Sequence, residues 1–142
     1  MFRDDDDVDD DRSTTSTQPQ QVLSPSQLNE ALIEAVCEGS ILKVQSLLDQ
    51  HADIHTRTGD MRETPLHLAS KYGHHQCIEL LLDRKADING GARWSYTPLH
   101  FASKHGHLQC IELLLYRHAD INARSDYSIT PLHEASRNGH HQ

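Results

Sequence analysis

A four-residue motif that recurs at a fixed interval is the strongest constraint on how this chain folds. Thr-Pro-Leu-His occurs at Thr64–His67, Thr97–His100 and Thr130–His133, so the interval is the same both times. When residues 64–96 are laid over residues 97–129, 22 of the 33 positions are identical. Self-similarity at a period of about 20–50 residues is the signature of stacked structural repeats. We therefore expect a solenoid in which each unit packs on its neighbours.

A more divergent copy precedes the first motif and begins near Asn29. Its apolar positions align with those of the next repeat, Leu32 with Leu66 for example, if one extra residue is allowed between His55 and Thr64. Connecting loops tolerate such insertions. This copy has Glu30-Ala31 where the others have Thr-Pro, which suits an N-terminal cap with a polar outer face.

The repeat itself predicts a helix, a turn, a second helix and an extended loop. Thr64 is placed to cap a first helix that opens with Pro65, and Gly73 is placed to end it in the left-handed conformation. The spacing from Cys77 to Leu82 fits a second helix. Isolated helices shorter than about 12–15 residues are marginal in water, so stability must come from stacking.

These motifs resemble those of the ankyrin repeat family. The matches are Thr-Pro-Leu-His-x-Ala, the Gly-His pairs, the triple Leu, and Ala-Asp-Ile-Asn at 86–89 and 119–122. The resemblance covers residues 28–142 and implies an all-α ankyrin-repeat solenoid of helix-turn-helix units joined by hairpin-like loops. It places the ankyrin domain at 25–142, with a degenerate repeat at 28–61, repeats at 62–94 and 95–127, and a partial repeat at 128–142.

The sequence departs from the family pattern where glycine is usual in the loops. The affected positions lie two residues before each Thr of the motif, or just before Ala-Asp: Arg62, Ser95, Ser128, His51, Lys85 and His118. If the backbone keeps a positive φ there, each non-glycine residue costs somewhat under about 1 kcal/mol.

Residues 1–24 have the composition of a disordered, solvated tail. The segment 1–28 holds seven Asp and two Arg, which gives −7 + 2 = −5 of the total charge of −8. The following Ser, Thr and Gln residues have too little apolar surface to offset the entropy of ordering. The Asp4–Asp11 run lacks the central Gly and distal Glu of an EF-hand calcium loop, so we expect no calcium site.

Composition excludes several classes of protein. A charge of −8 has the wrong sign for gripping a nucleic-acid backbone. The apolar runs are too short to span a membrane, and the acidic start does not resemble a signal peptide. Three cysteines do not make a disulfide framework. We expect an intracellular protein, cytoplasmic or nuclear, that acts as a monomer.

The twelve His and three Cys residues do not suggest a catalytic or metal site. By the family resemblance, the rings of His67, His100 and His133 hydrogen-bond to the Thr hydroxyl and to neighbouring loop backbone. Cys77 and Cys110 occupy equivalent positions on adjacent helices, too far apart for a disulfide, and are expected to be buried thiols. With no nucleophile dyad and no phosphate loop, we expect no enzyme, cofactor or metal.

The candidate site lies where the repeats differ. Six of the eleven differences between the two complete copies fall at Gly90–Trp94 and Tyr96. In the ankyrin family, these loop tips and the outer side of the first helix line a concave groove that binds partners. The partner-binding residues implied are Asp60, Met61, Glu63, Lys71, Tyr72, Arg93, Trp94, Tyr96, Lys104, His105, Asp126, Tyr127, Ile129, Arg137 and Asn138. For Tyr96 and Ile129, packing beneath the neighbouring loop is an equal alternative.

Non-catalytic binding of another protein is the function these features favour. Two alternatives remain open: the chain is the scaffolding or targeting part of a larger protein, such as a ubiquitin-ligase adaptor, channel or kinase, or it is itself an enzyme. Asn89 and Asn122 resemble ankyrin-repeat substrates of the iron-dependent asparaginyl hydroxylase, against a purely structural role in the loop. The chain ends inside a repeat, so we expect Leu132 and Ala135 to be uncovered on one side.

Overall fold

A computed structural model describes residues 23–137, so residues 1–22 of the predicted tail and Asn138 lie outside the described residues. The predicted tail extends too far at its end, because Leu23 packs against the core and Ser24 caps the first helix. That part of the chain forms α-helices and loops, with one isolated antiparallel bridge, Thr58 to Glu63, and no strand. The helices are α2 (Pro25–Glu38), α3 (Ile41–Asp49), α4 (Pro65–Tyr72), α5 (His75–Asp83), α6 (Pro98–Lys104), α7 (Leu108–Tyr116) and α8 (Pro131–Arg137), with the short 3-10 turn η1 (Arg93–Ser95) between α5 and α6.

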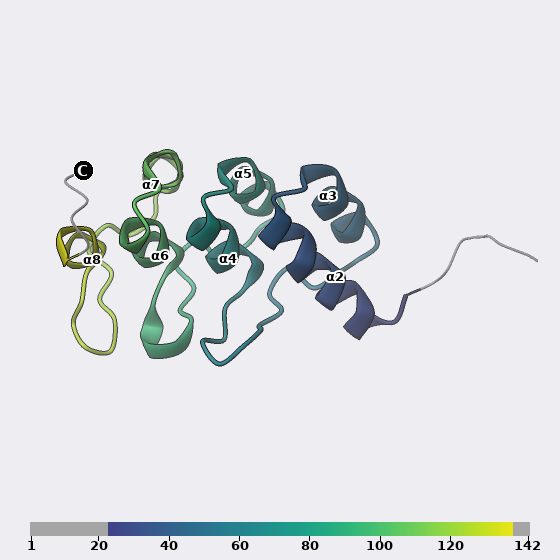
Figure 1. The fold of residues 1–142 in the computed structure, drawn as a ribbon, viewed down its shortest axis with the longest axis horizontal. Helices are drawn as coiled ribbons and strands as arrows, with labels where there is room; N and C mark the ends of the chain where they lie inside the picture. The colour runs from purple at the N-terminus through teal and green to yellow at the C-terminus, as the bar shows by residue number, and fades with distance from the viewer. Residues whose placement is uncertain (1–22, 138–142) are drawn as a thin grey trace, which may run out of the picture.

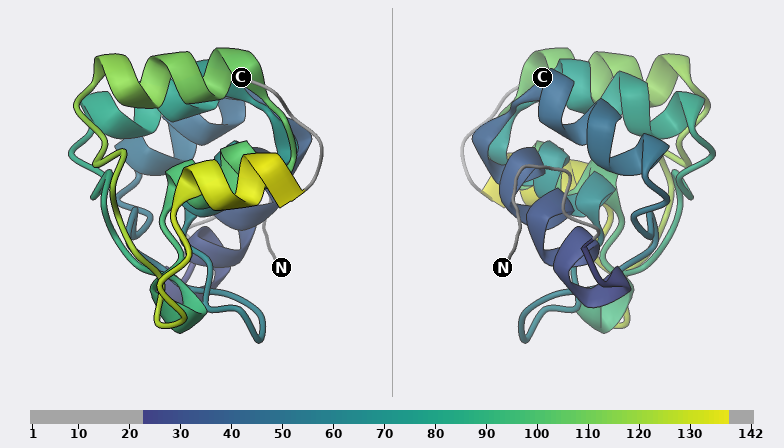
Figure 2. Two further views of the ribbon diagram at one scale, coloured as in Figure 1. Left: turned by 90° about the vertical axis from the view of Figure 1, so that its left-hand side faces the viewer. Right: turned by 90° about the vertical axis from the view of Figure 1, so that its right-hand side faces the viewer.

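The helices form two layers along one axis. Helices α2, α4, α6 and α8 lie side by side in the first layer, and α3, α5 and α7 form the second (Figure 1). The long loops descend from the helices and end in tips on the same side of the molecule, as both end views show (Figure 2). The all-α solenoid expected from the repeat period is confirmed.

The first helix of each full repeat begins with a capping box. The Thr64 hydroxyl accepts from the His67 backbone N–H, and the His67 Nδ1 accepts from the Thr64 backbone N–H, with Pro65 at the first helical position. Both donors would otherwise be unpaired at the start of the helix. Thr97 and His100 repeat this arrangement in α6.

The start of the first helix differs from the expectation. The alignment of the repeats placed Glu30-Ala31 in the role of Thr-Pro, but α2 begins well upstream of that pair, at Pro25 with Ser24 as its cap. Ser24 and Gln27 form the same reciprocal capping box, which the alignment did not reveal. Helix α2 is therefore 14 residues long, against eight in α4.

Histidine rings join each repeat to the one that follows. Nδ1 of His67 accepts from Thr64, so the proton of the neutral ring sits on Nε2, which donates to the carbonyls of Gly90 and Tyr96 at 2.9 Å each. His100 Nε2 donates to the Ile129 carbonyl at 2.7 Å. For His67 and His100 the hydrogen bonds implied by the resemblance are present, and each holds the loop that leads into the next repeat. His133 makes the expected bond with the Thr130 hydroxyl.

A second set of histidines joins each repeat to the one before. Nε2 of His74 donates to the Cys37 carbonyl at 3.0 Å, and Nε2 of His107 donates to the Lys71 carbonyl at 2.9 Å. These carbonyls lie in the last turn of the preceding first-layer helix, where helical partners are lacking. His74 and His107 belong to the Gly-His pairs that match the family pattern, but that match did not predict these bonds.

Apolar side chains fill the space between the two layers. Leu32, Leu66, Leu99, Ile78 and Leu114 are at most 1% exposed and belong to one continuous cluster. Full burial of such a side chain stabilises the fold by about 1.5–3 kcal/mol.

Two further expectations about side chains and backbone are confirmed. Cys77 and Cys110 are buried free thiols. All six non-glycine loop positions keep a positive φ, between 53° and 75°, which is the case in which each is expected to cost stability: His51, Arg62, Lys85, Ser95, His118 and Ser128.

At the last helix described, one expectation holds and one does not. Leu132 is 65% exposed, as expected. The expectation that Ala135 is uncovered is wrong, because Ala135 faces α6 beside Leu99 and is only 4% exposed. The two residues are three apart but point to different sides of α8.

Stability should fall with acid because His67 is buried as a neutral ring. Burial lowers the pKa of His67 to about 4, below the value of about 6.5 in an unfolded chain. Between these values the unfolded chain binds a proton that the folded chain does not, so stability present above about pH 6.5 is lost toward pH 4, on the order of 3 kcal/mol. An NMR titration should give a His67 midpoint near 4, and urea unfolding should show the slope.

Two variants test this assignment. His67→Gln should reduce the pH dependence of unfolding but not abolish it, because burial also lowers the pKa of His100. His133→Gln, at an exposed position, should keep the wild-type slope. A His67 midpoint near 6.5 would contradict the prediction.

Gly73 should resist substitution more than Gly59, although both have positive φ. At Gly73 (φ 78°) a Cβ would lie 2.7 Å from Nδ1 of His107, while at Gly59 (φ 71°) nothing lies within 4 Å. Gly59→Ala should cost about 1 kcal/mol of unfolding free energy from backbone strain alone. Gly73→Ala should cost at least about twice as much, because the His107 ring must move from the Lys71 carbonyl. If urea unfolding showed equal losses of stability for the two variants, the His107 ring would not pack tightly against Gly73.

Candidate partner-binding surface

Backbone hydrogen bonds join the three loop tips into one strip. The Arg93 N–H donates to the Met61 carbonyl at 2.7 Å, and the Asp126 N–H donates to the Trp94 carbonyl at 2.9 Å. Each bond crosses from one repeat to the next. Side chains on neighbouring tips are thereby held at fixed positions, which lowers the entropy lost when they bind.

An exposed aromatic cluster lies on this strip. The rings of Trp94 and Tyr127 are 6.3 Å apart, and the Arg93 guanidinium lies 4.8 Å from the Trp94 ring centroid. Trp94 is 38% exposed and Tyr127 is 66% exposed. The Ser95 hydroxyl donates to Asp126 at 2.8 Å and braces the two tips. We call Arg93, Trp94 and Tyr127 the tip cluster.

The backbone of the tip cluster is strained. Trp94 has φ 60° and ψ 24°, and the next residue, Ser95, has φ 62°. The Tyr96 N–H donates to the Arg93 carbonyl, so the tip is a tight turn with two left-handed residues, a geometry that favours Asn-Gly. A bulky residue there costs about 1–2 kcal/mol, and such strain is concentrated at functional sites. The expectation of a positive φ covered Ser95 but missed Trp94.

The ends of the first-layer helices form the second part of the surface. Lys71 is half-buried, and its Nζ lies 5.6 Å from the ring centroid of Tyr72, which is 47% exposed. Lys104 and His105 are exposed at the corresponding positions of α6, and the His105 ring stacks on His107 at 6.2 Å. Arg137 is exposed in the last turn of α8.

Some predicted contact residues are not available to a partner. Tyr96 is 9% exposed and packs on Phe101, so of the two alternatives for Tyr96 the core position is correct. Burial and a hydrogen bond with Glu134 raise the pKa of Tyr96 to about 12. Glu63 is 6% exposed, with its carboxylate 3.4 Å from Nζ of Lys71, so the expectation of direct contact is wrong for Glu63 too.

The remaining loop candidates divide between the surface and the interior. Asp60 and Asp126 are exposed. Met61 is half-buried against the small cluster that contains Tyr96. Ile129 is also half-buried, and its carbonyl is held by His100.

The two candidate hydroxylation residues are exposed in the loops that follow α5 and α7. The Asn89 Oδ1 accepts from the Asp120 N–H at 2.9 Å, so Asn89 ties its loop to the next one. Asn122 occupies the equivalent position and donates its own N–H to Asp120. The structural role is thus present at Asn89, and hydroxylation of either residue stays a prediction.

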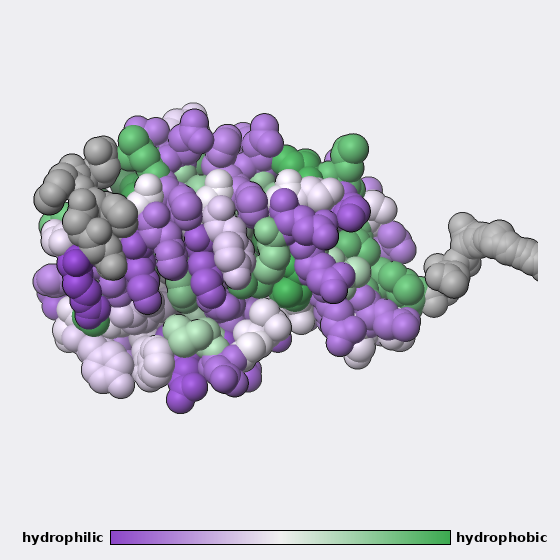
Figure 3. Space-filling model, viewed as in Figure 1, coloured by the Kyte–Doolittle hydropathy of each residue, from purple (hydrophilic) through white to green (hydrophobic). Residues whose placement is uncertain are grey.

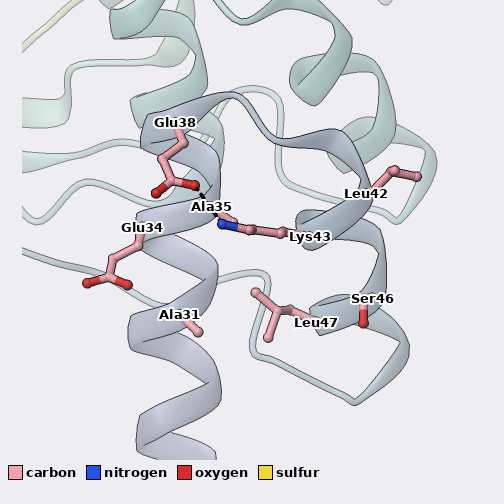
Figure 4. A pocket seen from close by; sticks show the side chains of 8 residues that line it. All are labelled: Ala31, Glu34, Ala35, Glu38, Leu42, Lys43, Ser46 and Leu47. Atoms are coloured by element: carbon pink, nitrogen blue, oxygen red, sulfur yellow. Dashed lines mark hydrogen bonds and ion pairs between the residues drawn. The ribbon is translucent and has the colours of Figure 1, made fainter.

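A separate groove of about 460 Å³ lies between α2 and α3, at the end of the solenoid (Figure 4). Its floor is formed by Ala31, Ala35 and Leu47, and an ion pair of 3.2 Å between Lys43 and Glu38 crosses its rim. Hydrophobic residues gather over this end of the molecule, whereas hydrophilic residues cover α4 and α6 (Figure 3). Glu34 and Ser46 also line the groove.

The described part of the chain contains neither a metal-binding cluster nor a membrane-spanning helix. Among residues 23–137, no three His, Cys, Asp or Glu side chains are grouped so that they could hold a metal ion. Within the same range, no helix has the length and apolar character needed to cross a membrane.

Known proteins carry segments similar to this chain. A family model described as ankyrin repeats (3 copies) matches residues 32–125 and 96–142. Similar proteins include Serine/threonine-protein kinase 12 of Arabidopsis thaliana, 42% identical over 57 residues, and the E3 ubiquitin-protein ligase XBAT32 of the same plant, 35% identical over 61 residues. An ankyrin repeat and KH domain-containing protein of Caenorhabditis briggsae is 36% identical over 67 residues.

The matched segments are local. They cover 40–44% of this chain, but only 12%, 2% and 12% of the kinase, the KH-domain protein and the ligase. The likeness to these proteins therefore concerns a short segment of each and not the rest of its length. The family model, in contrast, accounts for most of the chain and for every helix described from α3 onward. The chain belongs to the ankyrin repeat family.

Proposed function

We propose that this chain is a non-catalytic module that binds another protein through the tip cluster and the adjoining ends of α4 and α6. The observation that carries the proposal is the exposed Trp94 in a strained turn, with the tilted ring of Tyr127 beside it and the Arg93 guanidinium over its face. Trp, Tyr and Arg dominate the binding energy of protein interfaces, where each buries a large area. Ankyrin repeats generally mediate protein–protein interaction, which supports the proposal.

Exposed side chains of both charges surround the aromatic tip cluster, as expected at the rim of a protein interface. Asp60, Asp126 and Lys104 are exposed around the tip cluster and supply both signs of charge. Polar groups at the rim of an interface contribute more to specificity and association rate than to affinity. We infer that the aromatic centre supplies most of the binding free energy and that the charged rim selects the partner.

A second candidate function is targeting within a larger protein. The kinase and the ubiquitin ligase carry segments similar to this chain within much longer sequences. In that setting the same surface would recruit a substrate or regulator to an activity carried elsewhere. The two candidates share the binding surface and differ in whether a catalytic domain is attached.

The experiment compares binding by the wild-type chain with binding by Trp94→Ala/Tyr127→Ala. Proteins retained by the immobilised full chain are identified, the leading one is purified, and its Kd is measured. We expect the double variant to bind about 30-fold more weakly, or about 2 kcal/mol, because the aromatic area is lost. The melting temperature should stay nearly unchanged, since both rings are substantially exposed.

Tyr116→Ala is the matched control. Tyr116 is 79% exposed at the end of α7, in the other layer of the solenoid, and should not affect binding. Equal loss of binding in the control, or equal loss of stability and binding in the double variant, would show that the tip cluster is not the site.

Trp94→Gly should separate binding from stability. Glycine adopts φ 60° without steric cost, whereas alanine keeps the Cβ and the strain. We expect Trp94→Gly to be about 1 kcal/mol more stable than Trp94→Ala in urea unfolding, while both bind the partner equally weakly. Equal stabilities would mean that the turn at Trp94 is not strained.

A further inference from the structure

Three basic side chains occupy equivalent positions on successive first-layer helices. Lys71, Lys104 and Arg137 lie in the last turns of α4, α6 and α8, each at the same place in its repeat. These helices pack side by side, and hydrophilic residues cover α4 and α6 in Figure 3. We call these three residues the cationic row. The equivalent residue on α2 is Cys37, so the row begins at α4.

The cations of the row differ from other cations of the chain in how exposed their carboxylate partners are. Arg84 and Arg117 pair with the exposed carboxylates of Asp49 and Asp83 at 2.8 and 3.0 Å. In the row, Lys71 pairs with Glu63 at 3.4 Å, through a carboxylate whose side chain is only 8% exposed.

Arg137 shows the same asymmetry at the other end of the row. Its partner Glu134 lies 3.7 Å away with a side chain 1% exposed, while the Arg137 side chain is 60% exposed. At both ends of the row the carboxylates are covered, so the groups presented to an incoming ligand are cations.

The same chain contains a segment of matching charge. Seven of the eight residues from Asp4 to Asp11 are Asp, and residues 1–22 carry −7 + 2 = −5 of the total −8. Fully extended, this run spans about 25 Å. Packed helices are about 8–10 Å apart, so the three cations span about 20 Å. The lengths of the acidic run and the cationic row therefore match.

The connecting segment is long enough to bring them together. Helix α2, of 14 residues, is about 21 Å long, and one helix spacing separates it from α4, which gives a path of about 30 Å. Twelve residues, 12–23, join the acidic run to the start of the described fold and reach up to about 40 Å. Glu34 and Glu38 are exposed on α2 and repel the run, which favours α4, α6 and α8 over α2.

We propose that Asp4–Asp11 docks in cis on the cationic row, Lys71, Lys104 and Arg137. The contact is an acidic, extended peptide lying across the ends of three stacked helices. Because the row adjoins Tyr72 and His105, the docked segment would cover part of the surface proposed for partner binding and compete with an acidic partner. Docking goes beyond the proposed function and stands without it, since it requires no partner.

The test uses ¹⁵N NMR spectra of the full chain and of a full chain with all seven Asp of the run changed to Asn. We expect the backbone amides of residues 71, 104 and 137 to shift between the two at low salt. The differences should shrink in about 1 M NaCl, where the screening length is about 3 Å. They should not depend on protein concentration. Spectra that superimpose at these residues at low salt would overturn the proposal.

A complementary variant removes the row instead. Lys71→Gln/Lys104→Gln/Arg137→Gln should abolish the salt-dependent shifts of the Asp4–Asp11 amides, while Lys43→Gln, a cation outside the row, should leave them unchanged. If the triple variant fails to fold, the Asp-to-Asn comparison still decides, because it leaves the helices untouched.

Two further outcomes would point to another source of the acidic segment and overturn docking in cis. One is a shift that grows with protein concentration, which would indicate a second copy. The other is superimposable spectra of the two chains combined with shifts at the row on addition of an octa-aspartate peptide, which would indicate an acidic segment of a different protein. Neither result bears on the tip cluster, so failure here is distinct from failure of the proposed function.

Discussion

The rest of this structure depends on the hydrogen bonds made by the neutral histidine ring at the end of Thr-Pro-Leu-His. In one residue, His67 completes the capping box of α4 through Nδ1 and holds two loop carbonyls through Nε2. Helices of seven to nine residues are too short to persist alone, so each repeat needs both bonds: one that starts its helix and one that fixes the loop to its neighbour. Protonation of Nδ1 would remove an acceptor and place a charge in the interior, which is why the ring must remain neutral.

The fixed loops explain how a chain of near-identical repeats acquires one distinctive surface. The second set of histidines and the buried leucines hold the helical body constant, and the backbone bonds between Met61, Arg93, Trp94 and Asp126 align the tips. Several of the positions that vary, Arg93, Trp94 and Tyr127 among them, then carry side chains that face solvent at the tips. Trp94 is the extreme case, because its backbone is strained and its ring is exposed, and neither property stabilises the fold. Under the proposed function, the exposed Trp94 ring is the part of the surface that a partner would bury.

The same face also carries exposed basic groups, next to the aromatic tip cluster. The chain is acidic overall, yet the exposed groups at both ends of the cationic row are basic because their carboxylate partners, Glu63 and Glu134, are buried. Aromatic and cationic groups therefore lie on different parts of one surface, the tip cluster on the loops and the row on the helix ends. A partner that engages both would compete with any acidic segment held at the row.

The period, the capping residues and the loop glycine departures were all readable in the sequence, because they depend on local backbone chemistry and spacing. So were the buried Cys77 and Cys110 and the exposure of Trp94 and Tyr127. Contacts between repeats could not be read in this way. The burial of Tyr96 and Glu63, and the bonds from His74 and His107 to the preceding helix, depend on which side of a neighbour each residue meets. The cap at Ser24 is local and was missed because the alignment of the repeats drew attention to Glu30-Ala31 instead. Sequence alone determined the repeat unit and the segment that varies. Only the tertiary structure decided which varied residues face solvent, because burial is a property of the stack and not of the repeat.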